Sequence, residues 1–145
     1  SDGSSSTDVF DQLGLTDCVT WVHGVPDERI VELYSEAELA VVPSLYEGFS
    51  LPAIEAMSCG VPLVTTTGGA LPEVTGTHNV TCFQVPPGDS EALATMIATA
   101  LDNPESRENI GNNGRKRVIE HWSWHHTAAR TVEQYRSLLT ENKEN

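Results

Sequence analysis

The fold of this chain is decided by residues 39–66, which read LAVVPSLYEGFSLPAIEAMSCGVPLVTT. An apolar run closed by Pro43 is followed by a glycine-bearing loop, a short apolar segment and a second apolar run. Gly48 allows loop conformations that other residues resist, and Pro52 fits the first turn of a helix. Because the N–H groups of a helix start face outward, they attract anions. These residues therefore predict a strand, an anion-binding loop, a helix and a second strand.

Two carboxylates lie on either side of the expected helix start. Glu47 lies in the loop, where it is either a solvated loop acid or a group that binds a polyol or acts in acid/base chemistry. Glu55 is the only charge on the expected helix, and its apolar neighbours leave little of an exposed stripe. Ribose or sugar hydroxyls are natural partners for such a carboxylate. The pattern thus favours a ligand-binding role for Glu55 and leaves both readings of Glu47 open.

Apolar runs alternate with helical periodicity along the rest of the 145-residue chain, which is typical of parallel strands buried on both faces. We expect strands at residues 19–23, 39–42, 61–66 and 81–85. We expect helices at residues 27–38, 89–102, 105–120 and 124–139, with Asp89 as an N-cap. Gly111 and Gly114 interrupt the helical preference of residues 105–120. The sequence predicts one α/β domain over residues 1–145, with helices concentrated towards the C-terminus and residues 1–8 flexible.

Three loops rich in glycine and hydroxyl side chains follow expected strand ends, at residues 23–25, 44–50 and 65–71. In an open parallel sheet such loops line one edge and form a ligand crevice. Their composition suits phosphate and hydroxyl groups, although neither a Walker loop nor a G-x-G-x-x-G is present. His23, at one strand end, is either a ligand contact or a structural side chain.

Composition excludes several classes of partner. Eight basic against 21 acidic residues give a net charge of −13, which repels phosphate backbones and anionic lipids, so we expect neither nucleic acid nor membrane contact. Three widely spaced cysteines predict neither a disulfide framework nor a zinc site. The stretch HWSWHH, residues 121–126, lacks a carboxylate or fourth ligand and is read as an aromatic junction. With no signal peptide or apolar span visible, a cytoplasmic protein is expected.

Three motifs together carry a family resemblance. They are EGFSLPAIE at residues 47–55, paired glycines before LPE at residues 68–73, and WSWHHTAARTVEQY at residues 122–135. After Gln12 the chain resembles the C-terminal, donor-binding half of the retaining glycosyltransferases of family 4, which have the GT-B fold. The resemblance implies a Rossmann-like three-layer sandwich that binds a nucleotide sugar as donor substrate, with no cofactor and no metal.

The resemblance also implies roles for single residues. Glu47 corresponds to the glutamate near the donor sugar and its phosphate, and Glu55 to the one that binds the ribose hydroxyls. The remaining implied donor contacts are backbone N–H groups for the sugar and diphosphate at Gly48, Phe49, Ser50 and Leu51, and a border for the base at His23, Gly24 and Val25. Ser50 departs from the family, which usually has glycine there, so its side chain is expected to crowd or reshape the sugar pocket.

Other family features fall outside these 145 residues. The family's C-terminal half begins with a strand and an Arg–Lys pair that grips the diphosphate, and its acceptor cleft needs a separate N-terminal Rossmann domain. We therefore expect a truncated nucleotide-sugar-binding domain that is inactive alone and belongs to a metal-independent retaining hexosyltransferase. Two alternatives stay open: a noncatalytic nucleotide-sugar-binding module, and a GT-B sugar-nucleotide epimerase. The sequence leaves the donor base, the donor sugar, the acceptor and the oligomeric state unspecified.

Overall fold

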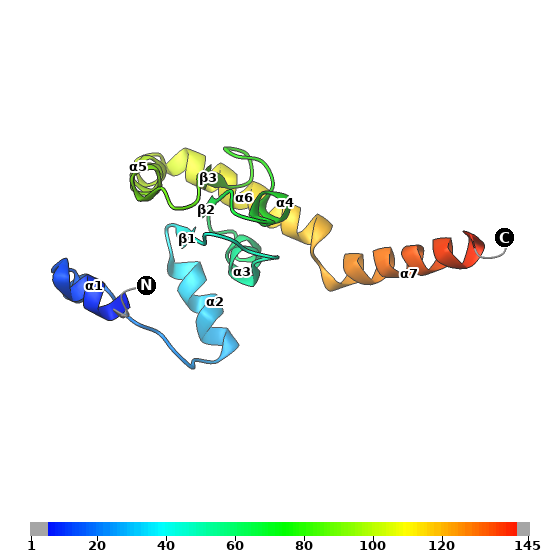
Figure 1. Cartoon of the computed structure of the whole chain (residues 1–145), viewed down its shortest axis with the longest axis horizontal. Helices are drawn as coiled ribbons and strands as arrows, with labels where there is room; N and C mark the ends of the chain where they lie inside the picture. Colours follow the sequence, from blue (N-terminus) through cyan, green and yellow to red (C-terminus); the bar gives the residue numbers. More distant parts are fainter. Residues whose placement is uncertain (1–5, 142–145) are drawn as a thin grey trace. The chain divides into compact units, whose positions relative to one another are not determined.

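Three parallel strands form one sheet in the computed structural model, which describes residues 6–141 (Figure 1). The strands are β1 (Ala40–Val42), β2 (Leu63–Thr66) and β3 (Phe83–Val85), in the order β1-β2-β3. Ala40 pairs with Leu63, and Val64 pairs with Phe83. The parallel sheet predicted from the apolar runs is confirmed. The fourth expected strand, at residues 19–23, is not formed: β-rich composition alone makes no strand without a paired ladder.

The chain divides into two units, residues 1–30 and 31–145, which we describe separately. The first unit holds α1 (Ser6–Gln12), the short 3-10 turn η1 (Thr16–Cys18) and the start of α2 (Asp27–Glu36). Residues 6–8, expected to be flexible, begin helix α1, whereas residues 1–5 lie outside the described residues. The prediction of a single domain over the whole chain stays a prediction.

Five further helices belong to the second unit: α3 (Leu51–Ser58), α4 (Leu71–Thr75), α5 (Ser90–Leu101), α6 (Pro104–His121) and α7 (Trp124–Glu141). The Asp89 side chain accepts a hydrogen bond of 2.9 Å from the N–H of Ala92, which confirms the expected N-cap of α5. The sequence predicts no helix at the position of α4, because five residues are too few to show a helical period.

Both faces of the sheet carry an apolar cluster, because successive strand side chains point in opposite directions. Leu63 belongs to one cluster and its neighbour Val64 to the other. The first cluster joins β1 and β2 to α3, α4 and α6 through Val42, Ala53, Met57, Leu63, Leu71, Cys82 and Val118. The second joins β2 and β3 to α5 and α6 through Val64, Phe83, Ala100 and Ile110. This is the expected α/β arrangement of a sheet between two helical layers.

Helix α6 runs without a break through Gly111 and Gly114, which confirms the expected helix although both glycines lower its helical preference. A Cβ at Gly111 would lie 2.2 Å from the carbonyl oxygen of Gly60, and one at Gly114 would lie 3.0 Å from that of Thr81. These glycines therefore let the helix approach neighbouring backbone closely, which offsets their low helix propensity.

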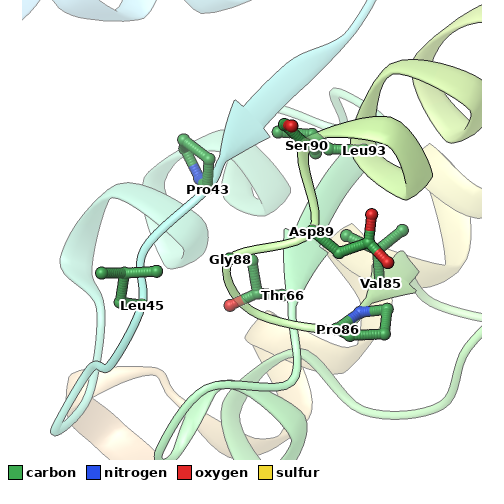
Figure 2. Close-up of a pocket in the computed structure, with 9 residues that line it drawn as sticks. All are labelled: Pro43, Leu45, Thr66, Val85, Pro86, Gly88, Asp89, Ser90 and Leu93. Carbon is green, nitrogen blue, oxygen red and sulfur yellow. The ribbon is translucent and has the colours of Figure 1, made fainter.

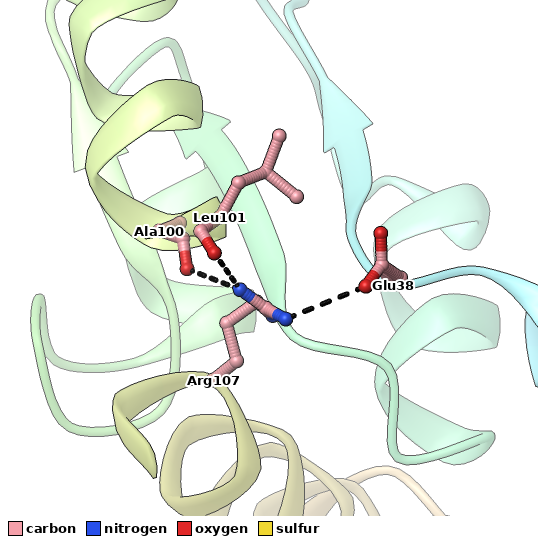
Figure 3. A network of polar contacts seen from close by, with 4 residues as sticks. All are labelled: Glu38, Ala100, Leu101 and Arg107. Carbon is pink, nitrogen blue, oxygen red and sulfur yellow. Dashed lines mark hydrogen bonds and ion pairs between the residues drawn. The ribbon is translucent and has the colours of Figure 1, made fainter. Parts of the chain in front are cut away.

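Arg107, in the first turns of α6, joins three segments (Figure 3). Its Nη1 donates to the carbonyl oxygens of Ala100, at 2.9 Å, and Leu101, the last residues of α5. Its Nη2 lies 3.5 Å from Oε1 of Glu38, which precedes β1. The arginine side chain is only 14% exposed. It adds donors at the C-terminal end of α5, where the carbonyl oxygen of Ala100 also accepts from the N–H of Asn103 at 3.3 Å.

Candidate functional site

The loop that follows β1 rests on the loop that follows β2, at the carboxyl edge of the sheet. The Oγ1 of Thr66 donates to the carbonyl oxygen of Ser44 at 2.5 Å. The N–H of Ala70 donates to the carbonyl oxygen of Glu47 at 2.8 Å. Two strand ends thus fix residues 44–50 where an open parallel sheet binds its ligands.

The paired glycines make this contact possible. A Cβ at Gly68 would lie 2.3 Å from the carbonyl oxygen of Leu45, and one at Gly69 would lie 2.3 Å from that of Glu47. Gly69 also has a φ of +63°, in the left-handed region that favours glycine. The sequence placed these glycines on the rim of a crevice; the structure shows that they support the neighbouring loop.

Glu47 is half-buried and oriented by its own loop. The hydroxyl of Ser44 donates to its Oε1 at 2.7 Å. Among residues 6–141 no protein donor is placed on its Oε2. Glu47 is therefore a positioned carboxylate with one oxygen open to a ligand, and not a freely solvated loop acid.

The backbone between Glu47 and the first turn of α3 offers a series of donors. Within the described part of the chain, no acceptor is placed on the N–H groups of Gly48, Phe49, Ser50 and Leu51. Helix α3 begins directly after them, with Pro52 in its first turn. Consecutive free N–H groups at a helix start form a favourable environment for an anion. The side chain of Phe49 is partly exposed, and its ring packs against Trp122.

Glu55 lies one turn into α3 and is exposed. Leu51, 62% exposed, and Pro52 share that surface, so the expectation that this helix leaves little of an exposed stripe is wrong. Burial raises the pKa of Tyr34, and the nearby Glu55 carboxylate raises it further. The Tyr34 hydroxyl donates to the carbonyl oxygen of Pro52 at 3.4 Å. Glu55 is thus accessible beside the helix start, next to Tyr34.

Three of the predicted site residues, His23, Gly24 and Val25, lie in the first unit. Gly24 has a φ of +61°, and the ring of His23 stacks on Trp21 with centroids 6.5 Å apart. Their predicted place beside the other site residues stays a prediction, since the two units are described separately.

A pocket of about 160 Å³ lies next to the Glu47 loop, at the ends of all three strands (Figure 2). It is lined by Pro43, Leu45, Thr66, Val85, Pro86, Gly88, Asp89, Ser90 and Leu93. Leu45 and Thr66 belong to loops that the sequence predicts at the ligand crevice, whereas none of the single residues predicted to bind the donor lines this pocket. The loop after β3, residues 86–89, is not among the loops predicted from the sequence at the crevice, because Asp89 is interpreted there only as a helix cap. Its signal is the turn sequence PPGD directly after an apolar strand.

Neither a metal cluster nor a membrane span is found in residues 6–141. No three or more His, Cys, Asp or Glu side chains there are grouped so that they could hold a metal ion. The rings of His121 and His126 meet at right angles, with centroids 6.2 Å apart. Within the same residues, no helix combines the length and the apolar character needed to cross a bilayer.

A parallel sheet with helices on both faces and donor-rich loops at its carboxyl edge defines a Rossmann-like α/β domain. The chain belongs to the family described as glycosyl transferases group 1, whose sequence profile matches residues 6–117. This confirms the family resemblance seen in the sequence. The subtype, family 4, stays a prediction.

Relatives and solved structures agree with this assignment. The chain is 43% identical over 128 residues to MMP alpha-(1->4)-mannosyltransferase of Mycolicibacterium hassiacum, covering 88% of this chain and 31% of the relative. It resembles sucrose-phosphate synthase from Thermosynechococcus elongatus with a TM-score of 0.83 and 36% identity, over 92% of this chain and 33% of the other. HepE of Anabaena, solved with UDP, gives a TM-score of 0.83 and 26% identity, over 90% and 35%. The chain thus spans about a third of the length of these proteins.

Proposed function

We propose that this chain forms the donor-binding part of a glycosyltransferase that transfers a sugar from a nucleotide sugar to an acceptor with retention. The observation that carries the proposal is the loop at residues 44–50, which joins a positioned carboxylate, Glu47, to a run of free N–H groups at a helix start. Such a loop suits a ligand with an anionic diphosphate and a sugar. Named mannosyltransferase relatives, and a structural neighbour solved with UDP, support this choice.

Each part of the site has a role in this proposal. The N–H groups of residues 48–51 bind the diphosphate and stabilise the negative charge that grows on it as the sugar leaves. Glu47 lies at the reacting end, where its carboxylate stabilises positive charge on the sugar. Glu55 accepts hydrogen bonds from the ribose, and residues 23–25 border the base.

The N–H groups and the helix start supply the electrostatic stabilisation that a metal ion gives in other enzymes, so we propose a metal-independent transfer. No cofactor is required, because the nucleotide sugar is the donor substrate. We place the protein in the cytoplasm. Since the relatives are about three times as long, the acceptor site is assigned to a further domain.

The test uses the purified full-length protein with a panel of nucleotide sugars. Calorimetry measures donor binding, and NMR of the products reports the anomer formed. Retained configuration in a transferred sugar supports the proposal. Epimerised nucleotide sugar without transfer would identify the epimerase alternative, and binding without turnover of any acceptor would identify a noncatalytic module. Binding of no nucleotide sugar contradicts all three.

A further inference from the structure

Ser50 carries a buried hydroxyl group that has no partner in the described protein. The residue is 4% exposed, and its Oγ makes no hydrogen bond. A buried hydroxyl without a partner destabilises the folded state, and native proteins rarely keep one. The partner of this hydroxyl is therefore expected to come from outside residues 6–141.

A structural role does not explain the serine. Ser50 is the N-cap of α3, yet its side chain makes no capping hydrogen bond, which is the usual reason for serine at that position. Its φ of +75° lies in the left-handed region, where glycine would be free of strain. Glycine would remove both the strain and the unpartnered hydroxyl. Serine therefore lowers the free energy of unfolding at this position, and no capping hydrogen bond offsets that loss.

We propose that Ser50 is a diphosphate-binding residue whose hydroxyl donates a hydrogen bond to an anionic oxygen of the donor; this rests on the proposed function. The free N–H groups of Gly48, Phe49 and Leu51 flank it and already favour an anion there. Because the hydroxyl makes no hydrogen bond within residues 6–141, it can rotate about the Cα–Cβ bond towards a ligand without breaking one. Hydrogen bonds to charged acceptors are the strong ones.

The test compares Ser50→Gly and Ser50→Ala with the parent full-length protein. The probes are UDP, GDP and ADP and their glucose conjugates, and the readouts are dissociation constants from calorimetry and melting temperatures. We expect both variants to bind the diphosphates and the nucleotide sugars about tenfold more weakly, a typical loss for one charge-assisted hydrogen bond. We expect Ser50→Gly to melt at a higher temperature than the parent, and Ser50→Ala to lie between them because its Cβ keeps the strain.

Asn79 offers a matched control, since it is the other non-glycine residue with a positive φ among residues 6–141, at +58°, and it is exposed outside the loop at residues 44–50. Asn79→Gly should relieve backbone strain and leave every dissociation constant unchanged. Unchanged diphosphate affinity in Ser50→Gly, or a lower melting temperature with weaker binding, contradicts the role of Ser50 alone. A parent protein that binds none of the probes contradicts the proposed function, and the role of Ser50 with it.

Discussion

The ring of Phe49 meets the ring of Trp122 edge to face, with centroids 5.3 Å apart and an interplanar angle of 78°. The indole Nε1 of Trp122 also donates to the carbonyl oxygen of Val74 at 3.1 Å. One side chain, placed where α6 ends, therefore contacts the loop of the candidate site and the end of α4. Edge-to-face aromatic pairs stabilise by about 0.5–1.5 kcal/mol beyond the area that they bury.

Shortening Trp122 should loosen this loop. Trp122→Phe keeps an aromatic ring and loses the hydrogen bond to the carbonyl oxygen of Val74. Because that oxygen also accepts from Nε of Arg117 at 3.0 Å, it keeps a donor. We therefore expect the free energy of unfolding to fall by only about 1 kcal/mol. Trp122→Ala removes the ring as well and should lower the free energy of unfolding by about 3 kcal/mol or more. Denaturant unfolding measures both. If both variants lower the free energy of unfolding equally, the contact between the rings of Phe49 and Trp122 does not contribute to stability.

Replacing Gly69 should displace the loop that carries Glu47. The Cβ of Gly69→Ala would lie 2.3 Å from the carbonyl oxygen of Glu47, at a φ of +63°. We expect a loss of about 2 kcal/mol or more in the free energy of unfolding, together with weaker donor binding in the full-length protein.

Gly48 gives the control for that stability change. A Cβ there meets no atom within 4 Å, so Gly48→Ala should change the free energy of unfolding by less than about 1 kcal/mol. If the two variants unfold at the same denaturant concentration, the close approach of Gly69 to Glu47 does not limit stability.

Much of the sheet and the loop could be predicted because their signals are local. The apolar run before Pro43 and the cap at Asp89 each depend on residues adjacent in sequence. Two other features depend on residues that are distant in sequence. Whether residues 19–23 form a strand depends on a neighbouring strand to pair with. The space beside Gly111 in α6 is set by Gly60. The strain at Ser50 was likewise invisible, since backbone dihedrals of a loop follow from its tertiary contacts.

Gly111→Ala tests which of two opposing effects wins in α6. Helix propensity favours alanine over glycine by about 1 kcal/mol. The added Cβ, however, would lie 2.2 Å from the carbonyl oxygen of Gly60, and backbone on both sides prevents an easy shift. We expect a net destabilisation of about 2 kcal/mol, measured by denaturant unfolding.

The neighbouring Asn112→Ala is the matched control, because Asn112 is exposed on the same helix. It should raise the free energy of unfolding by a few tenths of a kcal/mol, roughly the difference in helix propensity. Stabilisation by Gly111→Ala would mean that α6 does not pack closely on the turn at Gly60.

Arg107→Met should destabilise the junction between α5 and α6. It removes the donors to the carbonyl oxygens of Ala100 and Leu101 while it keeps much of the apolar stem. We expect a loss of about 1 kcal/mol in the free energy of unfolding, because the carbonyl oxygen of Leu101 loses its Arg107 donor, whereas that of Ala100 keeps the N–H of Asn103 at 3.3 Å. Thermal and denaturant unfolding measure the change.

Lys116→Met serves for comparison, since Lys116 is 74% exposed and lies 3.9 Å from Glu120 in an i,i+4 pair. Exposed pairs of this kind stabilise a helix by about 0.3–0.5 kcal/mol. If Arg107→Met lowers the free energy of unfolding no more than Lys116→Met does, Arg107 stabilises the protein no more than an exposed charge.

The two glutamates should divide the work of the proposed enzyme. Glu55 is exposed beside the helix start, and we assign it to the ribose. Glu55→Ala in the full-length protein should raise the Michaelis constant for the donor by an amount worth about 1.5–3 kcal/mol, since it removes a charge-assisted hydrogen bond from the ground state. Glu47→Gln keeps the size of the side chain and removes the charge that Ser44 orients at 2.7 Å, so turnover should fall.

Both variants should stay folded, because neither substitution opens a cavity in the core. Donor affinity by calorimetry and turnover at saturating donor separate the two effects, and Ser44→Ala adds a third point. That variant leaves the charge of Glu47 in place and removes the donor that orients it, so its turnover should lie between those of Glu47→Gln and the parent. Parental turnover in Glu47→Gln, or the same kinetic defect in the Glu47 and Glu55 variants, would show that the two carboxylates do not act on different parts of the donor.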